Sequence, residues 1–117
     1  MGVIIAAAVE PDGSVGHSWG KARSVVVATV DADDVSDWRP YEVAWDLLHD
    51  EGTSGAHHAR VVTFLRDHGV EMVLVDHVGD GMRRMLTSMG VDLREGIGGD
   101  ARAAMRAVVR TTDEPVG

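Results

Sequence analysis

The most constraining feature of the sequence is a short apolar segment near its start, Val-Ile-Ile-Ala-Ala-Ala-Val at residues 3–9. The segment is rich in branched residues and is followed at once by Glu-Pro-Asp-Gly, a turn sequence, at residues 10–13. A continuous apolar run of this length, bounded by a turn, is typical of a strand that is buried on both faces of a sheet. We therefore expect residues 3–9 to form the central strand of a sheet that is covered by helices.

The same segment also bears on location. It is much shorter than the roughly 20 apolar residues that a membrane-spanning helix needs. A secretory signal has a basic region before a longer apolar stretch, and only Met1 and Gly2 precede this one. We expect a cytoplasmic protein with no membrane partner.

The spacing of apolar residues predicts the remaining elements. Residues 24–30 are typical of a second strand, the Asp-rich residues 31–37 of a turn, and residues 38–45, which include Pro40, of an edge strand. From residue 53 the apolar spacing becomes helical, with Ser54 as the expected N-cap. The elements expected after the three strands are a helix to Gly69, a strand at 71–76, a helix at 82–90, a strand at 91–94 and a helix at 100–109.

This order predicts an α/β fold with one mixed, five-stranded sheet. The first three strands can pair as an antiparallel meander, whereas strands separated by helices imply two right-handed parallel crossovers. Three helices are expected to flank the sheet. A length of 117 residues fits one domain, which we place at residues 1–110, with a flexible tail at residues 111–117.

Composition excludes several classes of function. The chain has 19 acidic against 11 basic residues and a net charge of -8, which would repel the phosphates of a nucleic acid. It contains no cysteine, so thiolate catalysis and metal sites built on protein sulfur from cysteine are excluded. Any bound metal must be held by histidine, methionine, carboxylate or backbone groups.

Four histidines fall in segments that the expected fold brings to one edge of the sheet. Ligands of open α/β sheets bind beyond the carboxyl ends of the strands, and here that edge carries residues 10–22, 53–58 and 76–81. These segments contain His17, His57, His58 and His77. Imidazole is a common metal ligand, so the clustering suggests a transition-metal or metal-cluster site.

Other interpretations of these residues stay open. Any one histidine is more often an ordinary hydrogen-bonded residue than a ligand. Neighbouring helical positions point about 100° apart, so we do not expect His57 and His58 both to bind one small ion. Trp19, in a glycine-flanked loop, could close one side of a pocket or fill the end of the core. Backbone groups near Gly79 could receive an anion at a helix start.

Several of these motifs together resemble the dinitrogenase iron-molybdenum cofactor biosynthesis family. They are the element order, the loop ending Trp-Gly-Lys-Ala at 19–22, the helix start at 52–56 and the His-Val-Gly turn at 77–79. The resemblance covers residues 3–108 and implies a ribonuclease H-like fold. The family includes carriers of nitrogenase cofactor precursors and an orange molybdenum-copper cluster protein.

The resemblance also implies a site. The family loop commonly has the pattern His-Phe-Gly-x-Ala, which places Ser18, Trp19 and Gly20 at its first three positions and His17 one residue earlier. Ser18, Trp19, Gly20 and Gly79 are the implied cofactor-binding residues, and His17, His57, His58 and His77 are the candidate metal ligands. The cargo would be an iron-molybdenum or molybdenum-copper sulfur cluster, or a single transition-metal ion.

Three functions compete at this stage. The first is a non-catalytic carrier of a metal or metal-sulfur cluster, with a protein partner to which the cofactor is transferred. The second is a metal-free protein-interaction or regulatory domain, in which the histidines are incidental. The third is a nuclease of the same fold, which needs aligned carboxylates for its metal ions. The central strand has none, helix 54–69 has Asp67 near its far end, and strand 71–76 has acids only at its two ends, Glu71 and Asp76, so we discard the nuclease.

Overall fold

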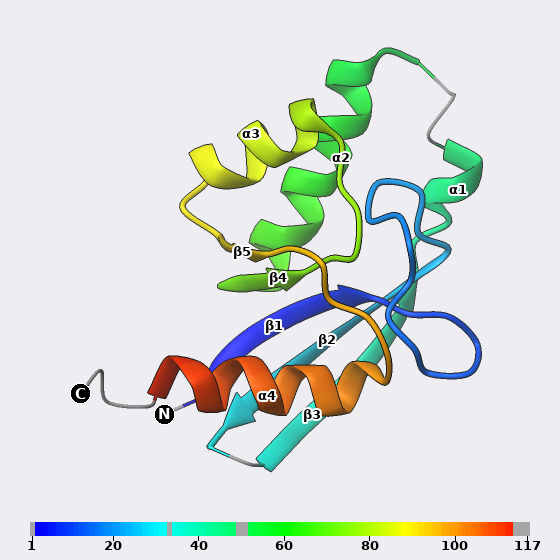
Figure 1. Ribbon diagram of the computed structural model, residues 1–117. Coiled ribbons are helices and arrows are strands. Elements are labelled where there is room, and N and C mark those ends of the chain that lie inside the picture. The colour runs from blue at the N-terminus through cyan, green and yellow to red at the C-terminus, as the bar shows by residue number, and fades with distance from the viewer. Residues whose placement is uncertain (1, 33, 49–51, 114–117) are drawn as a thin grey trace.

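The structure is a computed structural model that describes residues 2–32, 34–48 and 52–113. Its elements follow the expected order, with one additional short helix (Figure 1). The elements are β1 (Val3–Ala8), β2 (Ser24–Asp31), β3 (Asp34–Glu42), α1 (Trp45–Leu48), α2 (Ser54–Asp67), β4 (Met72–Leu74), α3 (Asp80–Ser88), β5 (Asp92–Arg94) and α4 (Ala101–Asp113).

The five strands form one mixed sheet in the order β3-β2-β1-β4-β5. β1 pairs antiparallel with β2, and β2 pairs antiparallel with β3, so the first three strands are a meander. β4 is parallel to β1, and β5 is parallel to β4. The predicted fold class and the central position of the first strand are therefore confirmed. At the carboxyl ends of the parallel pair, Ala7 lies opposite Leu74, which fixes where the loops after β1 and β4 begin.

The two faces of the sheet are covered by different helices. α2 and α3 cover one face and α4 covers the other (Figure 1). Successive residues of β1 alternate between the two cores: Ala6 and Ala8 pack in the first, and Ile5 and Ala7 in the second. This alternation follows from the two-residue repeat of a strand and explains why residues 5–8 are all buried. In the described ranges no helix is long and apolar enough to cross a membrane.

Both ends of β3 differ from the sequence prediction. β3 begins at Asp34, so residues 34–37 belong to a strand and not to a turn. The charged residues at 34–37 favour a turn in the sequence prediction. They form a strand because β3 is an edge strand, where charged residues are tolerated and protect the exposed edge. The strand ends at Glu42, since Ala44 adopts a left-handed φ of 54° and Trp45 starts α1.

The helix ends also differ. Thr53, and not Ser54, caps α2, because the Thr53 hydroxyl accepts the amide proton of Ala56 at 3.0 Å. α4 extends to Asp113, four residues beyond the expected end, so residues 111–113 are helical. The rest of the predicted tail, residues 114–117, lies outside the described residues.

Candidate metallocluster site

The loop after β1 and the turn after β4 are joined by backbone hydrogen bonds. The amide of His77 donates to the carbonyl of His17 at 2.9 Å, and the amide of Trp19 donates to the carbonyl of His77 at 3.1 Å. Ser18 and His77 form a parallel bridge between these bonds. The two segments therefore continue the parallel pairing of β1 and β4 for a short distance beyond the ends of these strands. This pairing holds the two segments in a fixed position relative to each other.

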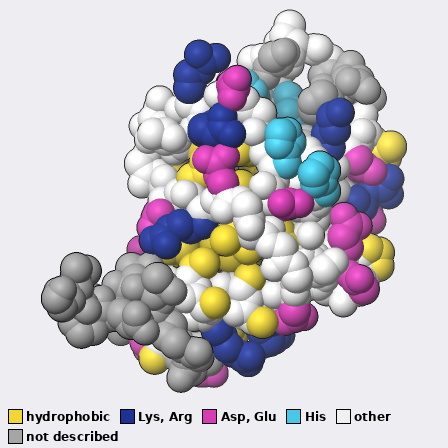
Figure 2. All heavy atoms as spheres, in the orientation of Figure 1, with side chains coloured by type: hydrophobic (Ala, Val, Ile, Leu, Met, Phe, Trp, Pro, Cys, Tyr) yellow, Lys and Arg dark blue, Asp and Glu magenta, His cyan; other side chains and the backbone are white. Residues whose placement is uncertain are grey.

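A cleft of about 470 Å³ lies between this joined edge and the starts of α2 and α3. We call it the histidine cleft, because three of the four candidate histidines line it. Histidine side chains gather on the corresponding face of the molecule (Figure 2). The lining residues are Ser18, Gly20, Lys21, His57, His58, His77, Gly79, Gly81 and Met82.

His57 is buried, with 3% of its surface exposed, and both of its ring nitrogens have partners. Its Nε2 lies 2.8 Å from the carbonyl oxygen of Gly20, and its Nδ1 lies 2.8 Å from Nη1 of Arg60. The ring also meets Trp45 edge-on at 6.3 Å between centroids. A buried polar side chain has to find such partners, because leaving them unmade costs about 1–3 kcal/mol.

His58 and His77 line the cleft from opposite elements. His58 lies on the first turns of α2, with its ring against Gly81 of α3: a Cβ at Gly81 would be 3.2 Å from Cε1 of His58. His77 belongs to the exposed turn after β4. The fold thus brings residues 19 positions apart in sequence to the two sides of one cleft.

His17 does not line the cleft, although it lies beside it. The Nδ1–H of His17 donates to Oδ2 of Asp76 at 2.9 Å, and its ring stacks on that of His77, with 5.6 Å between centroids and 11° between planes. His17 instead lines a second cavity on the other side of the loop. Its contacts with Asp76 and His77 hold it at the outer edge of the turn.

Trp19 fills the end of the core, one of the two alternatives that the sequence left open. Its side chain is 0% exposed and packs against Trp45 in a T-shaped arrangement, with 5.2 Å between ring centroids. Its indole Nε1 is buried without a hydrogen-bond partner. The side chain therefore supports the loop from below, while the neighbouring Ser18 and Gly20 face the cleft.

Lys21 lines the cleft but is not among the site residues that the sequence motifs imply. It is exposed and is the only lysine in the sequence. It follows Gly20 directly, but an ammonium group is not a metal ligand, so a pattern of metal ligands does not indicate it. Gly81 and Met82 were likewise missed, since they reach the cleft only because α3 starts beside Gly20, whose Cβ would lie 3.7 Å from the Met82 methyl.

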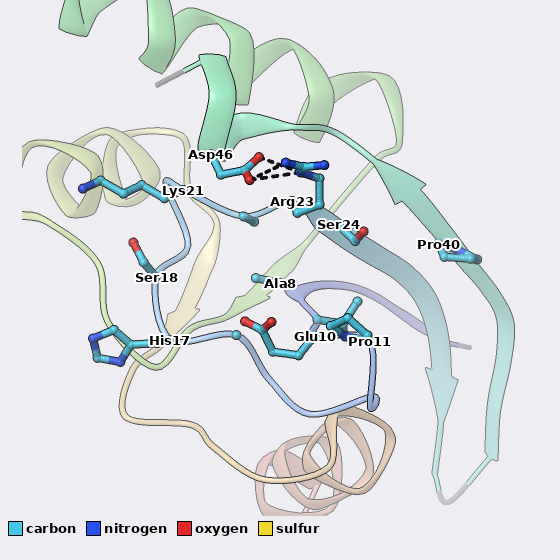
Figure 3. Close-up of a pocket in the computed structure, with 13 residues that line it drawn as sticks. Ala8, Glu10, Pro11, His17, Ser18, Lys21, Arg23, Ser24, Pro40 and Asp46 are labelled. Atoms are coloured by element: carbon cyan, nitrogen blue, oxygen red, sulfur yellow. Dashed lines mark hydrogen bonds and ion pairs between the residues drawn. The ribbon is translucent and has the colours of Figure 1, made fainter. Parts of the chain in front are cut away.

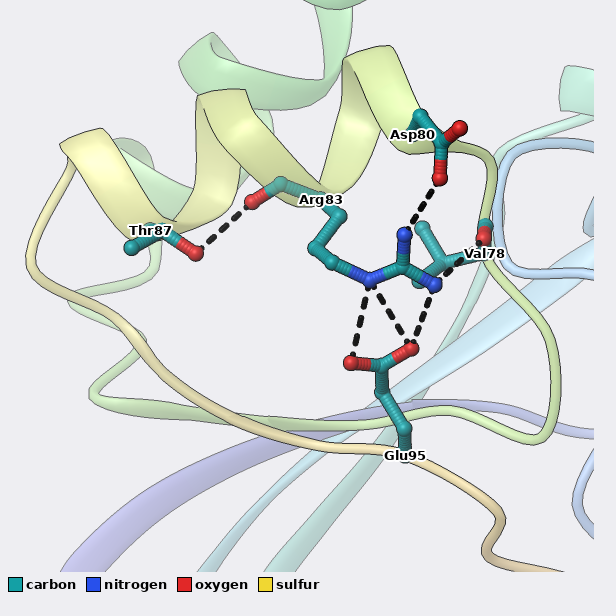
Figure 4. A network of polar contacts seen from close by, with 5 residues as sticks. All are labelled: Val78, Asp80, Arg83, Thr87 and Glu95. Carbon is teal, nitrogen blue, oxygen red and sulfur yellow. Dashed lines mark hydrogen bonds and ion pairs between the residues drawn. The ribbon is translucent and has the colours of Figure 1, made fainter.

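The first turn of α3 is fixed by Arg83 (Figure 4). Its guanidinium binds Glu95 with Nη2···Oε1 at 2.7 Å, pairs with Asp80 and donates to the carbonyl of Val78 at 3.3 Å. Hydrogen bonds from Arg83 hold the pKa of Glu95 below its ordinary value, and those carboxylates raise the pKa of Arg83. The carboxylate closest to the start of α3, that of Asp80, is thereby neutralised by a cation of its own helix.

No three His, Asp or Glu side chains within the described ranges come together as a ready-made set of metal ligands. His57 is committed to hydrogen bonds, and His17 is held against Asp76. His58 and His77 remain as the histidines that line the cleft with no side-chain hydrogen bond among those described. The arrangement can thus offer one or two imidazole nitrogens, an ammonium and backbone amides.

The chain belongs to the dinitrogenase iron-molybdenum cofactor family, whose pattern it matches over residues 1–111. The resemblance that the sequence motifs suggested is thereby confirmed, and family membership associates the chain with binding of a metal cluster. No curated protein matches the sequence.

Solved structures share the fold at low sequence identity. The apo form of the orange protein from Desulfovibrio gigas has a TM-score of 0.70 and 20% identity, covering 97% of this chain and 93% of its own. The protein PH0822 has a TM-score of 0.71 and 22% identity, covering 92% and 89%. A putative dinitrogenase from Methanocaldococcus jannaschii has a TM-score of 0.68 and 9% identity, covering 95% and 91%. These likenesses support the observed α/β fold with its five-stranded mixed sheet.

Proposed function

We propose that the protein is a non-catalytic carrier that binds a metal-sulfur cluster in the histidine cleft. The observation that carries the proposal is the composition of the cleft: three histidines and the only lysine of the chain line it, and none of the described lining residues is a carboxylate. In a protein of net charge -8, a cavity lined in this way favours an anionic ligand over a free metal cation.

The start of α3 adds to this preference. Gly79 is the N-cap of α3 and provides no side-chain hydrogen bond to its first turn. Amide groups at a helix start carry partial positive charge and bind anions when no side chain caps them. Together with Lys21, they add positive charge to the lining of the cleft.

The absence of cysteine agrees with a cluster as cargo. The chain supplies no thiolate, and its described part holds no three-ligand group for a bare ion. A thiometallate or metal-sulfur cluster brings its own sulfide ligands, so it needs only one or two nitrogens from the protein. His58 and His77 are the proposed ligands, and Ser18, Gly20 and Gly79 are the proposed surrounding contacts. The iron-molybdenum and molybdenum-copper clusters associated with the family are the proposed cargo types, released to a partner protein.

The test is a titration of the purified, untagged protein with tetrathiomolybdate, and separately with Zn²⁺ and Cu²⁺, followed by absorption and by histidine ring NMR signals. We expect tetrathiomolybdate to bind stoichiometrically and to shift the rings of His58 and His77 together. Removal of the ammonium in Lys21→Met should weaken binding about tenfold, the effect of losing one close charge pair in a partly solvated site.

Glu10→Gln is the matched control, because Glu10 is exposed and lines the other cavity. It should leave tetrathiomolybdate affinity unchanged. The double variant His58→Ala/His77→Ala should lose the absorption change. Absence of binding by the unaltered protein, or equal binding by this double variant, would contradict the carrier function and favour a metal-free interaction domain.

A further inference from the structure

The buried imidazole of His57 calls for an explanation apart from metal binding. It is the only polar or charged side chain classed as buried in the described part of the chain. Burial of an imidazole is costly unless its nitrogens are hydrogen-bonded, so the partners of His57 indicate why it lies there. Those partners come from two different elements: Arg60 lies one turn further along α2, and Gly20 lies in the loop after β1.

The two contacts fix the protonation state of the ring. A guanidinium can only donate, so Nδ1 of His57 accepts a proton from Arg60 and carries none itself. A carbonyl oxygen can only accept, so Nε2 carries the proton and donates it to Gly20. The ring is therefore neutral and in the Nε2–H tautomer. Both of its nitrogens are engaged by protein partners and not by the cleft.

The bond to Gly20 has a consequence for the cleft. The carbonyl of His17 and the amide of Trp19 bond to His77 on the β4 side, whereas the carbonyl of Gly20 bonds to His57 of α2. Lys21 is the next residue. The direction of the Gly20 carbonyl fixes the peptide plane that joins the two residues, and so sets where the Lys21 side chain leaves the backbone.

We propose that His57 is a positioning residue for cargo binding: held in one tautomer by Arg60, it anchors the Gly20 carbonyl and thereby places the Lys21 ammonium at the cleft. The inference rests on the proposed function, because Lys21 contributes to binding only if the cleft takes an anion. It also assigns His57 a role different from that of His58 and His77.

The tautomer is tested first, because it does not depend on any cargo. Long-range ¹H–¹⁵N NMR should show a protonated Nε2 and an unprotonated Nδ1 for His57. In Arg60→Met, which removes the donor and keeps a long side chain, Nε2 should stay protonated toward Gly20, whereas Nδ1 should become able to take up a proton. A protonated Nδ1 in the unaltered protein would overturn the assignment.

The positioning role is tested by a double-mutant cycle with tetrathiomolybdate as the probe. His57→Phe keeps a ring but loses both hydrogen bonds, and His57→Gln keeps a donor that can reach Gly20. We expect His57→Phe to weaken binding about fivefold, a loss typical of one hydrogen bond, and His57→Gln to restore most of it. In the Lys21→Met background the same His57→Phe change should have no further effect.

Additive losses in the cycle would show that His57 acts on the fold as a whole and would overturn the proposal. Failure of the unaltered protein to bind tetrathiomolybdate would instead refute the proposed function. In that case amide hydrogen exchange still tests the anchor: the amide of Lys21 should exchange faster in His57→Phe than in His57→Gln. Equal exchange in the two variants would mean that His57 does not anchor the loop.

Discussion

Two cavities flank the loop after β1, and the charged side chains that line them differ. The histidine cleft measures about 470 Å³ and has no carboxylate among the described residues that line it. The cavity on the other side, which we call the Glu10 pocket, is larger, about 720 Å³. Its walls carry Glu10 and an ion pair between Arg23 and Asp46 (Figure 3). The larger cavity is therefore not the better candidate for an anionic cargo, because its charges are mixed and partly satisfied by each other.

Two acids close to the cleft do not line it, because each is paired with another side chain. Asp76 and Asp80 flank the turn that lines the cleft, yet each binds a partner: Asp76 binds His17, and Asp80 binds Arg83. Both partners lie outside the cleft lining. The two acids beside the cleft are thus directed toward hydrogen-bond donors that lie outside its lining.

The largest expected effect comes from Trp19, which supports the loop that separates the two cavities. Trp19→Ala removes a fully buried indole that packs on Trp45, and we expect it to lower the free energy of unfolding by about 3–5 kcal/mol. Urea unfolding followed by circular dichroism measures the loss. Tetrathiomolybdate affinity should fall as well, because Ser18 and Gly20 lose their support.

Two further variants sharpen that result. Trp19→Phe keeps a ring and removes the unpaired indole N–H, so its cost should be clearly smaller than that of Trp19→Ala. Trp38→Ala removes a half-buried indole of β3 that stacks on Arg102 at 4.4 Å and lines neither cavity. It should destabilise the protein without changing affinity. Equal losses of affinity in Trp19→Ala and Trp38→Ala would refute a specific role for the loop.

The sequence predicted the sheet well because the sheet depends on strong local patterns. The apolar run at residues 3–9 and the helical spacing of residues such as Met82 and Leu86 leave few alternatives, and both segments pack in the core as expected. Predictions failed where tertiary context decides. Asp34 and Asp37 lie in a strand because that strand is at an edge; Pro40 indicated the edge, but no local pattern marked where the strand begins.

The candidate site was predictable only in part, for a similar reason. The topology placed His58 and His77 at one edge, and both line the cleft. The sequence could not tell that His57 would point inward to Gly20, because that depends on how far the loop after β1 folds over α2. Nor could it indicate Lys21, which reaches the cleft only because of how the loop after β1 folds.

A second prediction uses two glycines that both line the cleft. A Cβ at Gly81 would lie 3.2 Å from Cε1 of His58, whereas a Cβ at Gly79 would have no atom within 4 Å. Gly81→Ala should displace the His58 ring by a few tenths of an ångström and weaken tetrathiomolybdate binding about threefold. Its stability should not fall, because alanine favours the helix.

Gly79→Ala is the matched control. It adds the same methyl group to the same cleft, but at a position with open space around it. Alanine is a poor N-cap, so a small loss of stability is expected with unchanged affinity. If both variants bind tetrathiomolybdate equally well, the position of His58 does not matter for binding, and the comparison of the two cavities rests on Lys21 alone.

The smallest expected effect is on acid stability, and it concerns the ion pair of the Glu10 pocket. A hydrogen bond from Arg23 lowers the pKa of Asp46 below its ordinary value of 3.8. A carboxylate with a lowered folded-state pKa stabilises the protein above its ordinary pKa, and this contribution is lost as the pH falls through the folded-state pKa. Asp46→Asn should therefore be less stable than the unaltered protein at pH 7, and the difference should shrink below about pH 4.

Thermal unfolding midpoints between pH 2.5 and 7 measure this convergence. Because Asp46 is a surface residue, the difference at pH 7 should be small, as is usual for solvent-exposed ion pairs. Tetrathiomolybdate affinity at pH 7 should be the same in Asp46→Asn as in the unaltered protein, because the ion pair lines the Glu10 pocket and not the histidine cleft. A changed affinity would mean that the two cavities act as one site across the loop, with Lys21, which lines both, as the residue that connects them.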